Sequence, residues 1–243
     1  MDQNTYTIKE NKMIARDTFE MRLEGDTSAF ARPGQFVNIK LPERFLRRPI
    51  SVCDWDDRGF VIIYKCVGDG TRYMSELPIG DQLDILTGLG NGFDVERAGE
   101  RPLIAGGGVG TPPLYALAKR LVARGLRPTV FLGFASKDDA ICIDKFEELG
   151  LDVRVATVDG SLGTRGFITD IATDGESFSY YYSCGPEPML RALIAKFGEA
   201  GELSFEERMG CGFGACMGCT CKTKGGHKRI CREGPVLRAE EVE

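Results

Sequence analysis

The chain has 243 residues, 42% of them hydrophobic and 28% charged, which is typical of a globular protein with one large domain or two or three small ones. Its net charge of −5 argues against general nucleic-acid binding, which needs a basic surface. No apolar run is long enough to span a bilayer, and the polar residues 1–12 lack the apolar core of a secretory signal. We therefore expect a cytoplasmic protein with reduced thiols and with no nucleic-acid or membrane partner.

The first part of the chain, residues 1–98, has the pattern of a small antiparallel β-barrel. Short segments of alternating or β-branched residues are separated by Gly and Pro. The predicted strands are 18–23, 35–41, 60–67 and 82–86, and a further strand begins near residue 47. Short strands at this spacing are typical of a barrel.

Residues 99–200 alternate strands with helices, which indicates a parallel α/β sheet. The predicted strands are 102–105, 129–134, 153–157 and 180–183, and the main helices are 112–124 and 188–197. Residues 201–243 are rich in Gly and Cys and form a third, short module. The predicted fold class is multi-domain: an antiparallel barrel, a parallel-sheet nucleotide-binding domain and a small C-terminal module.

The nine cysteines are unevenly distributed, because five of them fall within residues 211–231. Four have the spacing Cys211-x4-Cys216-x2-Cys219-x11-Cys231, which is typical of plant-type ferredoxins that bind a [2Fe–2S] cluster. Interspersed glycines let the backbone wrap closely around an inorganic core. Residues 208–232 also contain six basic and no acidic side chains, a charge pattern that would favour an anionic cluster.

The alternative for these cysteines is a zinc ribbon, which uses two C-x2-C-like pairs in a closed tetrahedral site. Only one C-x2-C pair is present, so the spacing favours iron and sulfur. Cys221 could replace Cys219 as a ligand, but the C-x2-C spacing favours Cys219, and we expect Cys221 not to bind the cluster. His227 is expected to be a solvated loop residue, since four cysteines already suffice.

Two short motifs in the barrel could bind phosphate. The segment Arg48-Pro49-Ile50-Ser51 offers a forked guanidinium and a hydroxyl three residues later. Gly70 and Thr71 open a short predicted helix whose N–H groups are free. Either motif alone could be an ordinary surface loop. Their position directly before a nucleotide-type domain makes the phosphate interpretation more attractive.

Two further motifs follow predicted strands of the α/β domain. The glycines Gly106, Gly107, Gly108 and Gly110 lie between a strand and a helix, the context in which a backbone approaches a pyrophosphate. Their spacing differs from G-x-G-x-x-G, which argues against a standard Rossmann dehydrogenase. Cys184-Gly185-Pro186 follows the last strand of the domain. Taken alone, that segment is more typical of a simple turn with a buried thiol.

Together these residues resemble the ferredoxin reductase-like flavoprotein superfamily. Arg48 to Ser51 resembles its flavin-binding R-x-x-S motif, Gly106 to Gly110 its pyridine-nucleotide loop, and Cys184 to Pro186 its nicotinamide-side C-G-P motif. The tail from Glu207 to Lys222, with Lys228 to Val236, closely resembles the electron transfer subunits of type B dihydroorotate dehydrogenases. That resemblance runs over essentially the whole chain.

The resemblance implies a set of cofactors and a partner. FAD would contact Arg48, Pro49, Ile50 and Ser51, with Ile63, Tyr64 and Lys65 along the isoalloxazine and Gly70 and Thr71 near a phosphate. The cluster would lie on Cys211, Cys216, Cys219 and Cys231, and NAD would be the co-substrate. A partner subunit would carry FMN and oxidise dihydroorotate to orotate in pyrimidine biosynthesis, in a heterotetramer with two copies of each subunit.

A flavin exchanges a hydride with NAD and can also release single electrons, whereas the cluster carries one electron at a time. Electrons would pass from FMN through the cluster and FAD to NAD⁺, and no catalytic acid–base residue is needed on this chain. One alternative is the NAD(P)H-handling subunit of a hydrogenase or of a ferredoxin-linked transhydrogenase. Another is a non-catalytic module whose cluster senses redox state.

The choice between NAD and NADP depends on residues after the second nucleotide-domain strand. Asp138 or Asp139 could bind a ribose 2′-hydroxyl, while Lys137 could accept a 2′-phosphate. These residues leave the choice open, and the resemblance implies NAD.

Overall fold

The first 89 residues form a closed six-stranded antiparallel barrel. The structure, a computed structural model, describes residues 1–243. The barrel strands, paired in the order β1-β2-β5-β4-β3-β6, are β1 (Asp2–Ala15), β2 (Thr18–Glu24), β3 (Phe36–Ile39), β4 (Arg48–Trp55), β5 (Gly59–Lys65) and β6 (Gln82–Leu89). Helix α1 (Asp69–Ser75) joins β5 to β6. Inward-facing residues of the strands, with Phe30, Leu41 and Met74 from the loops and α1, make a core of 15 buried residues, so the predicted barrel is confirmed.

Strand β1 was not predicted from the sequence. It has 14 residues and pairs with both β2 and β6, so it closes the barrel. Most of its side chains are polar, most are exposed or half-buried, and only Tyr6 and Ile8 are buried. A mostly polar strand gives a weak alternation signal, which explains why the sequence pattern did not reveal it.

A seven-stranded sheet follows the barrel. Its strands, in spatial order, are β10 (Thr164–Arg165), β9 (Asp152–Thr157), β8 (Thr129–Phe134), β7 (Pro102–Gly107), β11 (Tyr180–Cys184), β12 (Gly201–Ser204) and β15 (Val236–Arg238). All neighbours are parallel except β12 and β15. The chain starts at β7 in the middle of the sheet and adds β8, β9 and β10 on one side. It then returns and adds β11, β12 and β15 on the other side, so the strand order reverses between β7 and β11.

Three helices accompany this sheet, and each begins just after a strand or turn. They are α2 (Pro113–Ala123), α3 (Ile143–Glu148) and α4 (Glu187–Phe197). Helix α2 starts with Pro113, which fits the first turn, where a missing N–H costs little. Its buried face carries Leu114, Leu117 and Leu121. The predicted parallel α/β architecture is confirmed.

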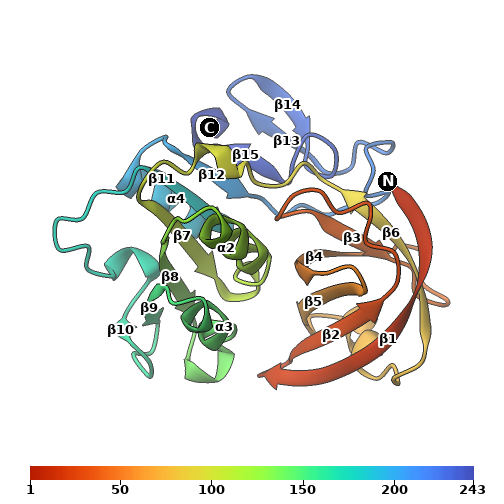
Figure 1. Ribbon diagram of the computed structural model, residues 1–243. Helices are drawn as coiled ribbons and strands as arrows, with labels where there is room; N and C mark the ends of the chain where they lie inside the picture. Colours follow the sequence, from red (N-terminus) through yellow and green to blue (C-terminus); the bar gives the residue numbers. More distant parts are fainter.

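The C-terminal module lies across the top of both larger units (Figure 1). It contains a small hairpin, β13 (Thr220–Thr223) and β14 (Gly226–Arg229), and then returns to the nucleotide sheet as β15. Strand β12 also belongs to that sheet. The sheet therefore continues beyond the predicted boundary at residue 200, because β12 pairs with β11 and β15 pairs with β12.

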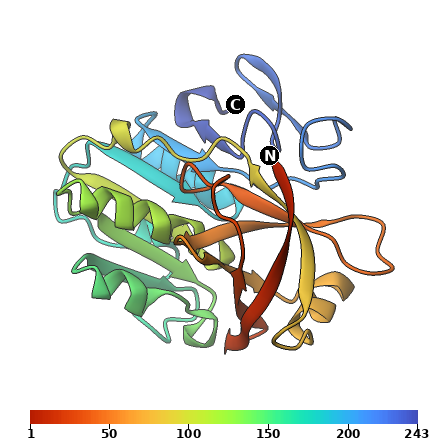
Figure 2. The same cartoon turned by 45° about the vertical axis from the view of Figure 1, so that its right-hand side comes forward.

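The barrel and the nucleotide sheet share an interface of charged and apolar contacts. Figure 2 shows α2 and α3 in front of the sheet, and 18 buried residues from both units form one core cluster. Across the interface, Lys119 on α2 lies 2.7 Å from Asp54, and Lys145 on α3 lies 3.1 Å from Glu20. These contacts fix the sheet against β2 and β4. No helix in the structure has the length and apolar character required to cross a membrane.

Candidate functional site

The two predicted phosphate motifs of the barrel lie against each other. Arg48 begins β4 and Gly70 lies in the first turn of α1. A Cβ atom added at Gly70 would collide with the Arg48 guanidinium in its present position, so the glycine lets this side chain lie directly against the turn. The Thr71 hydroxyl accepts from the Val67 N–H at 3.0 Å and donates to the Gly68 carbonyl at 3.1 Å. It therefore orders the loop that presents Gly70.

The remaining residues of the first motif, Pro49, Ile50 and Ser51, follow Arg48 along β4 and are half-buried. Each pairs with a residue of β3, with Pro49 opposite Asn38 and Ser51 opposite Phe36. The motif is therefore part of the barrel wall and not a free loop.

The three residues predicted to lie along a flavin ring point in different directions. Tyr64 faces the barrel interior, where its hydroxyl donates to Asn11 at 3.0 Å and burial raises the pKa of its phenol. Ile63 packs in the core cluster shared with the nucleotide sheet. Lys65 ends β5, with its Nζ 3.3 Å from Asp139. Ile63, which is buried, and Lys65 therefore lie on the face of β5 toward the nucleotide sheet, and Tyr64 lies on the opposite face.

The predicted nucleotide loop and the Cys184–Pro186 turn meet at the ends of adjacent strands. Cys184 pairs with Gly106 across β11 and β7. A Cβ atom at Gly110 would collide with the Cys184 carbonyl, and one at Gly107 would lie 2.5 Å from the Met189 sulfur. This is also where the strand order reverses, the place at which open α/β sheets bind ligands. Burial raises the pKa of the Cys184 thiol to about 12, so it is neutral at pH 7.

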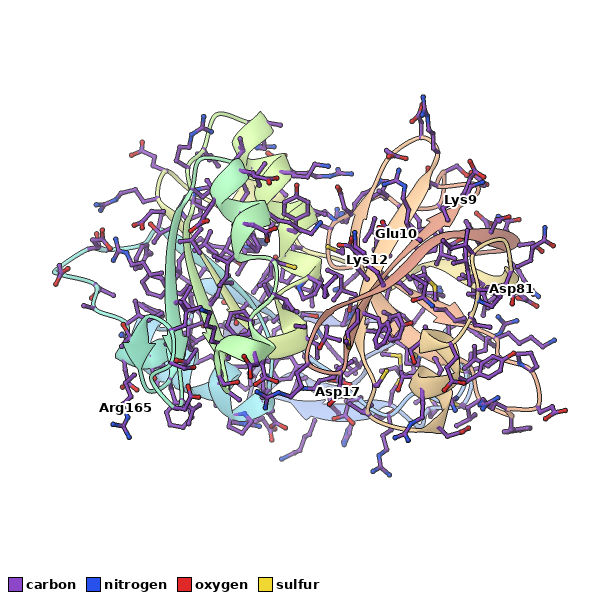
Figure 3. The ribbon with its side chains drawn as sticks, turned by 90° about the horizontal axis from the view of Figure 1, so that it is seen from below. Lys9, Glu10, Lys12, Asp17, Asp81 and Arg165 are labelled. Atoms are coloured by element: carbon purple, nitrogen blue, oxygen red, sulfur yellow. The ribbon has the colours of Figure 1, made fainter.

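The carboxylates proposed to read the nucleotide ribose already have partners in the barrel. Arg16, beside the β1–β2 turn, lies 2.9 Å from Asp138 and donates to the Ser136 hydroxyl at 3.1 Å. A hydrogen bond from Ser136 lowers the pKa of Asp139, and Lys65 adds to this. Figure 3, seen from below, shows the neighbouring Asp17 on the side of the barrel that faces the sheet. The sequence did not reveal this contact, because it joins segments about 120 residues apart.

The four predicted ligand cysteines gather as two pairs. The sulfurs of Cys219 and Cys231 are 3.2 Å apart. In the other pair, the Cys216 N–H points at the Cys211 sulfur and the Cys211 N–H at the Cys216 sulfur, each at 3.4 Å. Cys221 belongs to neither pair, and no three Cys, His, Asp or Glu side chains converge as ligands of one metal ion.

The loop around Cys211 and Cys216 directs further backbone N–H groups at sulfur. Ala215 donates to Cys211 at 3.2 Å and Gly218 to Cys216 at 3.5 Å. Partial burial raises the pKa of Cys211, but the N–H groups of Cys216, Phe213 and Ala215 outweigh it and lower the pKa to about 6. Burial raises the pKa of Cys231 to about 12. A [2Fe–2S] cluster takes two thiolates on each iron, so two thiol pairs with amide donors fit that group.

The predicted excess of positive charge around the cysteines is smaller than the sequence implied. Carboxylates from outside the loop pair with Lys222, Lys224, Lys228 and Arg229. Only Arg208 and Arg232 of the six basic residues have no ion pair. Arg229 still contributes to the loop, because its guanidinium donates to the Gly214 carbonyl at 2.7 Å. His227 is exposed, as expected, but it lies in strand β14 and not in a loop.

Two asparagines that the sequence did not single out attach the tail to the barrel. Asn38 on β3 donates to the Cys211 carbonyl at 3.1 Å. Asn91, after β6, donates to the carbonyls of Glu233 and Val236 at 3.1 and 2.7 Å. Neither asparagine carries a local sequence signal for such a contact.

These features define a class of protein: a reductase fold for FAD and a pyridine nucleotide, extended by a cysteine-rich tail. Residues 206–243 match the family model "Iron-sulfur cluster binding domain of dihydroorotate dehydrogenase B".

Two curated relatives carry the name "Dihydroorotate dehydrogenase B (NAD(+)), electron transfer subunit". The chain is 45% identical to the Fusobacterium nucleatum protein, covering 98% of this chain and 97% of the relative. It is also 45% identical to the Bacillus mycoides protein, covering 100% and 99%. The chain belongs to the family of electron transfer subunits of dihydroorotate dehydrogenase B.

Solved structures agree with the fold. A structure of an NADH-dependent reduced ferredoxin–NADP oxidoreductase matches with a TM-score of 0.89 and 34% identity, covering 98% of this chain and 89% of the other. The Amycolatopsis cytochrome P450 reductase GcoB matches with a TM-score of 0.70 and 22% identity, covering 81% and 65%. The second likeness concerns the fold alone.

Proposed function

We propose that the chain binds FAD on the barrel and a [2Fe–2S] cluster on Cys211, Cys216, Cys219 and Cys231. It would pass electrons from the FMN of a dihydroorotate-oxidising partner to NAD⁺, in pyrimidine biosynthesis. The observation that carries this proposal is the pairing of the four thiols on a segment attached to the barrel. Bound FAD would convert between single electrons and a hydride.

The chain itself would supply binding and orientation. Arg48 and the Gly70 turn would hold flavin phosphate through a guanidinium and free N–H groups. Gly106, Gly107, Gly108 and Gly110 would let the backbone approach a nucleotide pyrophosphate, with Cys184, Gly185 and Pro186 beside the nicotinamide. The N-terminus of α2 would favour the phosphate charge.

The family name implies a partner subunit, and the resemblance implies how the two assemble. We propose a complex with an FMN-containing dihydroorotate dehydrogenase catalytic subunit, two copies of each. All nine cysteines are free, which suits the cytoplasm, where thiols stay reduced.

The direct test is cofactor analysis followed by coupling. Purified protein should be yellow-brown and release FAD and about two iron atoms per chain. Mixed with the catalytic subunit, it should reduce NAD⁺ when dihydroorotate is added. A colourless preparation containing zinc would contradict the proposal. A KM comparison of NAD⁺ and NADP⁺ would settle the nucleotide.

A second candidate is an NAD(P)H-handling subunit of a ferredoxin-linked transhydrogenase, which the match at TM-score 0.89 favours. The higher identity to the dihydroorotate dehydrogenase subunits, 45% against 34%, favours the first. If NADH oxidation stays uncoupled from dihydroorotate in the presence of the catalytic subunit, the second candidate gains. If NADH does not bleach the flavin absorbance in a stopped-flow experiment, the chain is a redox-sensing module instead.

A further inference from the structure

Asn38 connects the wall of the barrel to the first ligand cysteine. It lies in β3, is 1% exposed, and stands opposite Pro49 of the predicted flavin motif in β4. Its Nδ2 donates to the Cys211 carbonyl oxygen at 3.1 Å. Its own carbonyl accepts from Arg47 at 3.2 Å, next to Arg48 in the chain. One residue therefore contacts the cysteine loop through its side chain and the flavin strand through its backbone.

The orientation of the Asn38 amide depends on the Cys211 contact. The Asn38 Oδ1 is buried and has no hydrogen-bond partner. The reversed amide would place Oδ1 against the Cys211 carbonyl, which is also an acceptor, so donation to Cys211 determines the orientation. An unpaired buried acceptor destabilises the fold, and an apolar side chain of similar size would avoid that cost. Packing alone therefore does not call for an asparagine at this position.

The cysteine loop is shaped to receive this side chain. Gly212 has a φ of +80°, and a Cβ atom there would collide with the Asn38 Nδ2. Just beyond, the loop bends so that the N–H groups of Ala215 and Cys216 point at the Cys211 sulfur, at 3.2 and 3.4 Å. Fixing the Cys211 carbonyl therefore fixes the start of the turn that surrounds its sulfur.

We propose that Asn38 is a positioning residue for electron transfer between the cluster and the flavin. It acts through Cys211 and holds the solvent-exposed side of the cluster at a set distance and orientation from β4. The proposal rests on the proposed function, because it needs a cluster on Cys211 and a flavin on β4. Two consequences follow. The reduction potential of the cluster depends on Asn38, because the N–H···S bonds of the loop tune that potential. The rate of electron transfer depends on Asn38 as well.

The test compares Asn38→Leu with Asn91→Leu in the holoprotein. Both remove an asparagine that bridges barrel and tail, but Asn91 contacts Glu233 and Val236 and no ligand cysteine. Three quantities are measured on each: the electron paramagnetic resonance spectrum of the reduced cluster, its midpoint potential, and the stopped-flow rate of cluster reduction after NADH is added. Iron and FAD contents and the melting temperature are controls.

For Asn38→Leu we expect a changed spectrum, a shifted potential and a roughly tenfold or larger fall in the rate, as for other residues that orient metal ligands. Its melting temperature should be unchanged or higher, because the unpaired acceptor is gone. Asn91→Leu should keep the wild-type spectrum and potential. A wild-type spectrum, potential and rate in Asn38→Leu would overturn the proposal, as would equal spectroscopic changes in both variants.

The pH dependence of the rate in Asn38→Asp distinguishes a hydrogen-bonding role from a packing role. The carboxylate cannot donate to Cys211, whereas the protonated acid can, so the rate should recover as the pH falls. A rate defect independent of pH would count against the hydrogen bond. Failure of the proposed function would give a different result. The wild-type protein would then contain no iron or no FAD, which is measured before any variant is compared.

Discussion

The two thiol pairs of the tail are held by different forces. Cys219 and Cys231 are each 2% exposed, and they pack in an apolar cluster with Phe36, Leu86 and Leu89 of the barrel. Cys211 and Cys216 lie on a surface loop that is ordered by backbone N–H groups and by Asn38. Cys211 and Cys216 are therefore the exposed half of the site, and Cys219 and Cys231 are the buried half.

This difference separates folding from electron exchange within one short segment. The buried half adds apolar contacts between the barrel and the tail, so its substitution should affect stability as well as cofactor content. The exposed half contributes few apolar contacts, so substitution of its cysteines should affect the cofactor content and not the stability of the apoprotein. Phe213 and Met217, 39% and 55% exposed, lie in this exposed loop and not in the core.

Loss of a ligand cysteine is the largest effect that we expect. Cys211→Ser and Cys231→Ser should both lower the iron content from about two atoms per chain to near zero. Only Cys231→Ser should also lower the melting temperature of the apoprotein, because Cys231 is in the apolar cluster. Cys221→Ser is the matched control and should retain iron. Iron loss in Cys221→Ser, with iron kept in Cys219→Ser, would reassign the ligand.

The next largest effect concerns packing around the buried half. Ile230 is fully buried in the cluster that joins the tail to the barrel. Ile230→Ala should destabilise the protein by about 2–5 kcal/mol, from lost burial and the cavity left behind. Phe213→Ala, in the exposed loop, should cost less than about 0.5 kcal/mol. Urea unfolding of the two variants measures both, and equal losses would show that the two halves do not differ in this way.

The sequence could reveal the local features of the site but not the contacts between distant segments. Ligand spacing is local, so Cys211 to Cys231 could be identified, and strand alternation gave most of the barrel and sheet. Contacts between distant segments have no local pattern. Asn38 with Cys211, and Arg16 with Asp138, join residues more than 100 positions apart. The ion pairs that neutralise Lys222 and Lys228 also come from residues outside the basic segment.

Strand β12 illustrates a second limit. Gly201–Ser204 is only four residues long and is fully buried, yet it follows directly on a helix and precedes the cysteine-rich segment. A short buried strand shows no periodicity of its own. Its place in the sheet depends on β11 and β15, which flank it on either side, so only tertiary structure identifies it.

A smaller effect on stability concerns β12 and β15, the strands of the sheet that flank the cysteine-rich segment in the chain. Glu202 of β12 stands opposite Arg238 of β15 and accepts from the Asp94 N–H at 2.9 Å. Burial raises the pKa of Glu202 to about 7. The folded state therefore loses stability as pH rises from the unfolded-state pKa near 4.5 through about 7, where ionisation becomes costly.

Glu202→Gln removes that cost while keeping an acceptor for the Asp94 N–H. The variant should be about 3 kcal/mol more stable than wild type at pH 8, and the difference should nearly vanish at pH 4.5. Urea unfolding at the two pH values measures this. A constant difference at both values would mean that ionisation of Glu202 is not its cause.

The smallest effect compares the two thiol pairs directly. In the apoprotein the Cys211 pKa is about 6 and the Cys231 pKa about 12. Because the thiolate is the nucleophile, iodoacetamide should alkylate Cys211 at least roughly tenfold faster than Cys231 at pH 7. The Cys211 rate should rise through pH 6 and then level off, while Cys231 stays slow up to high pH. Peptide mass spectrometry after timed quenching measures both sites in one sample. Comparable rates would show that amide donors and burial do not make the two thiol pairs differ in reactivity.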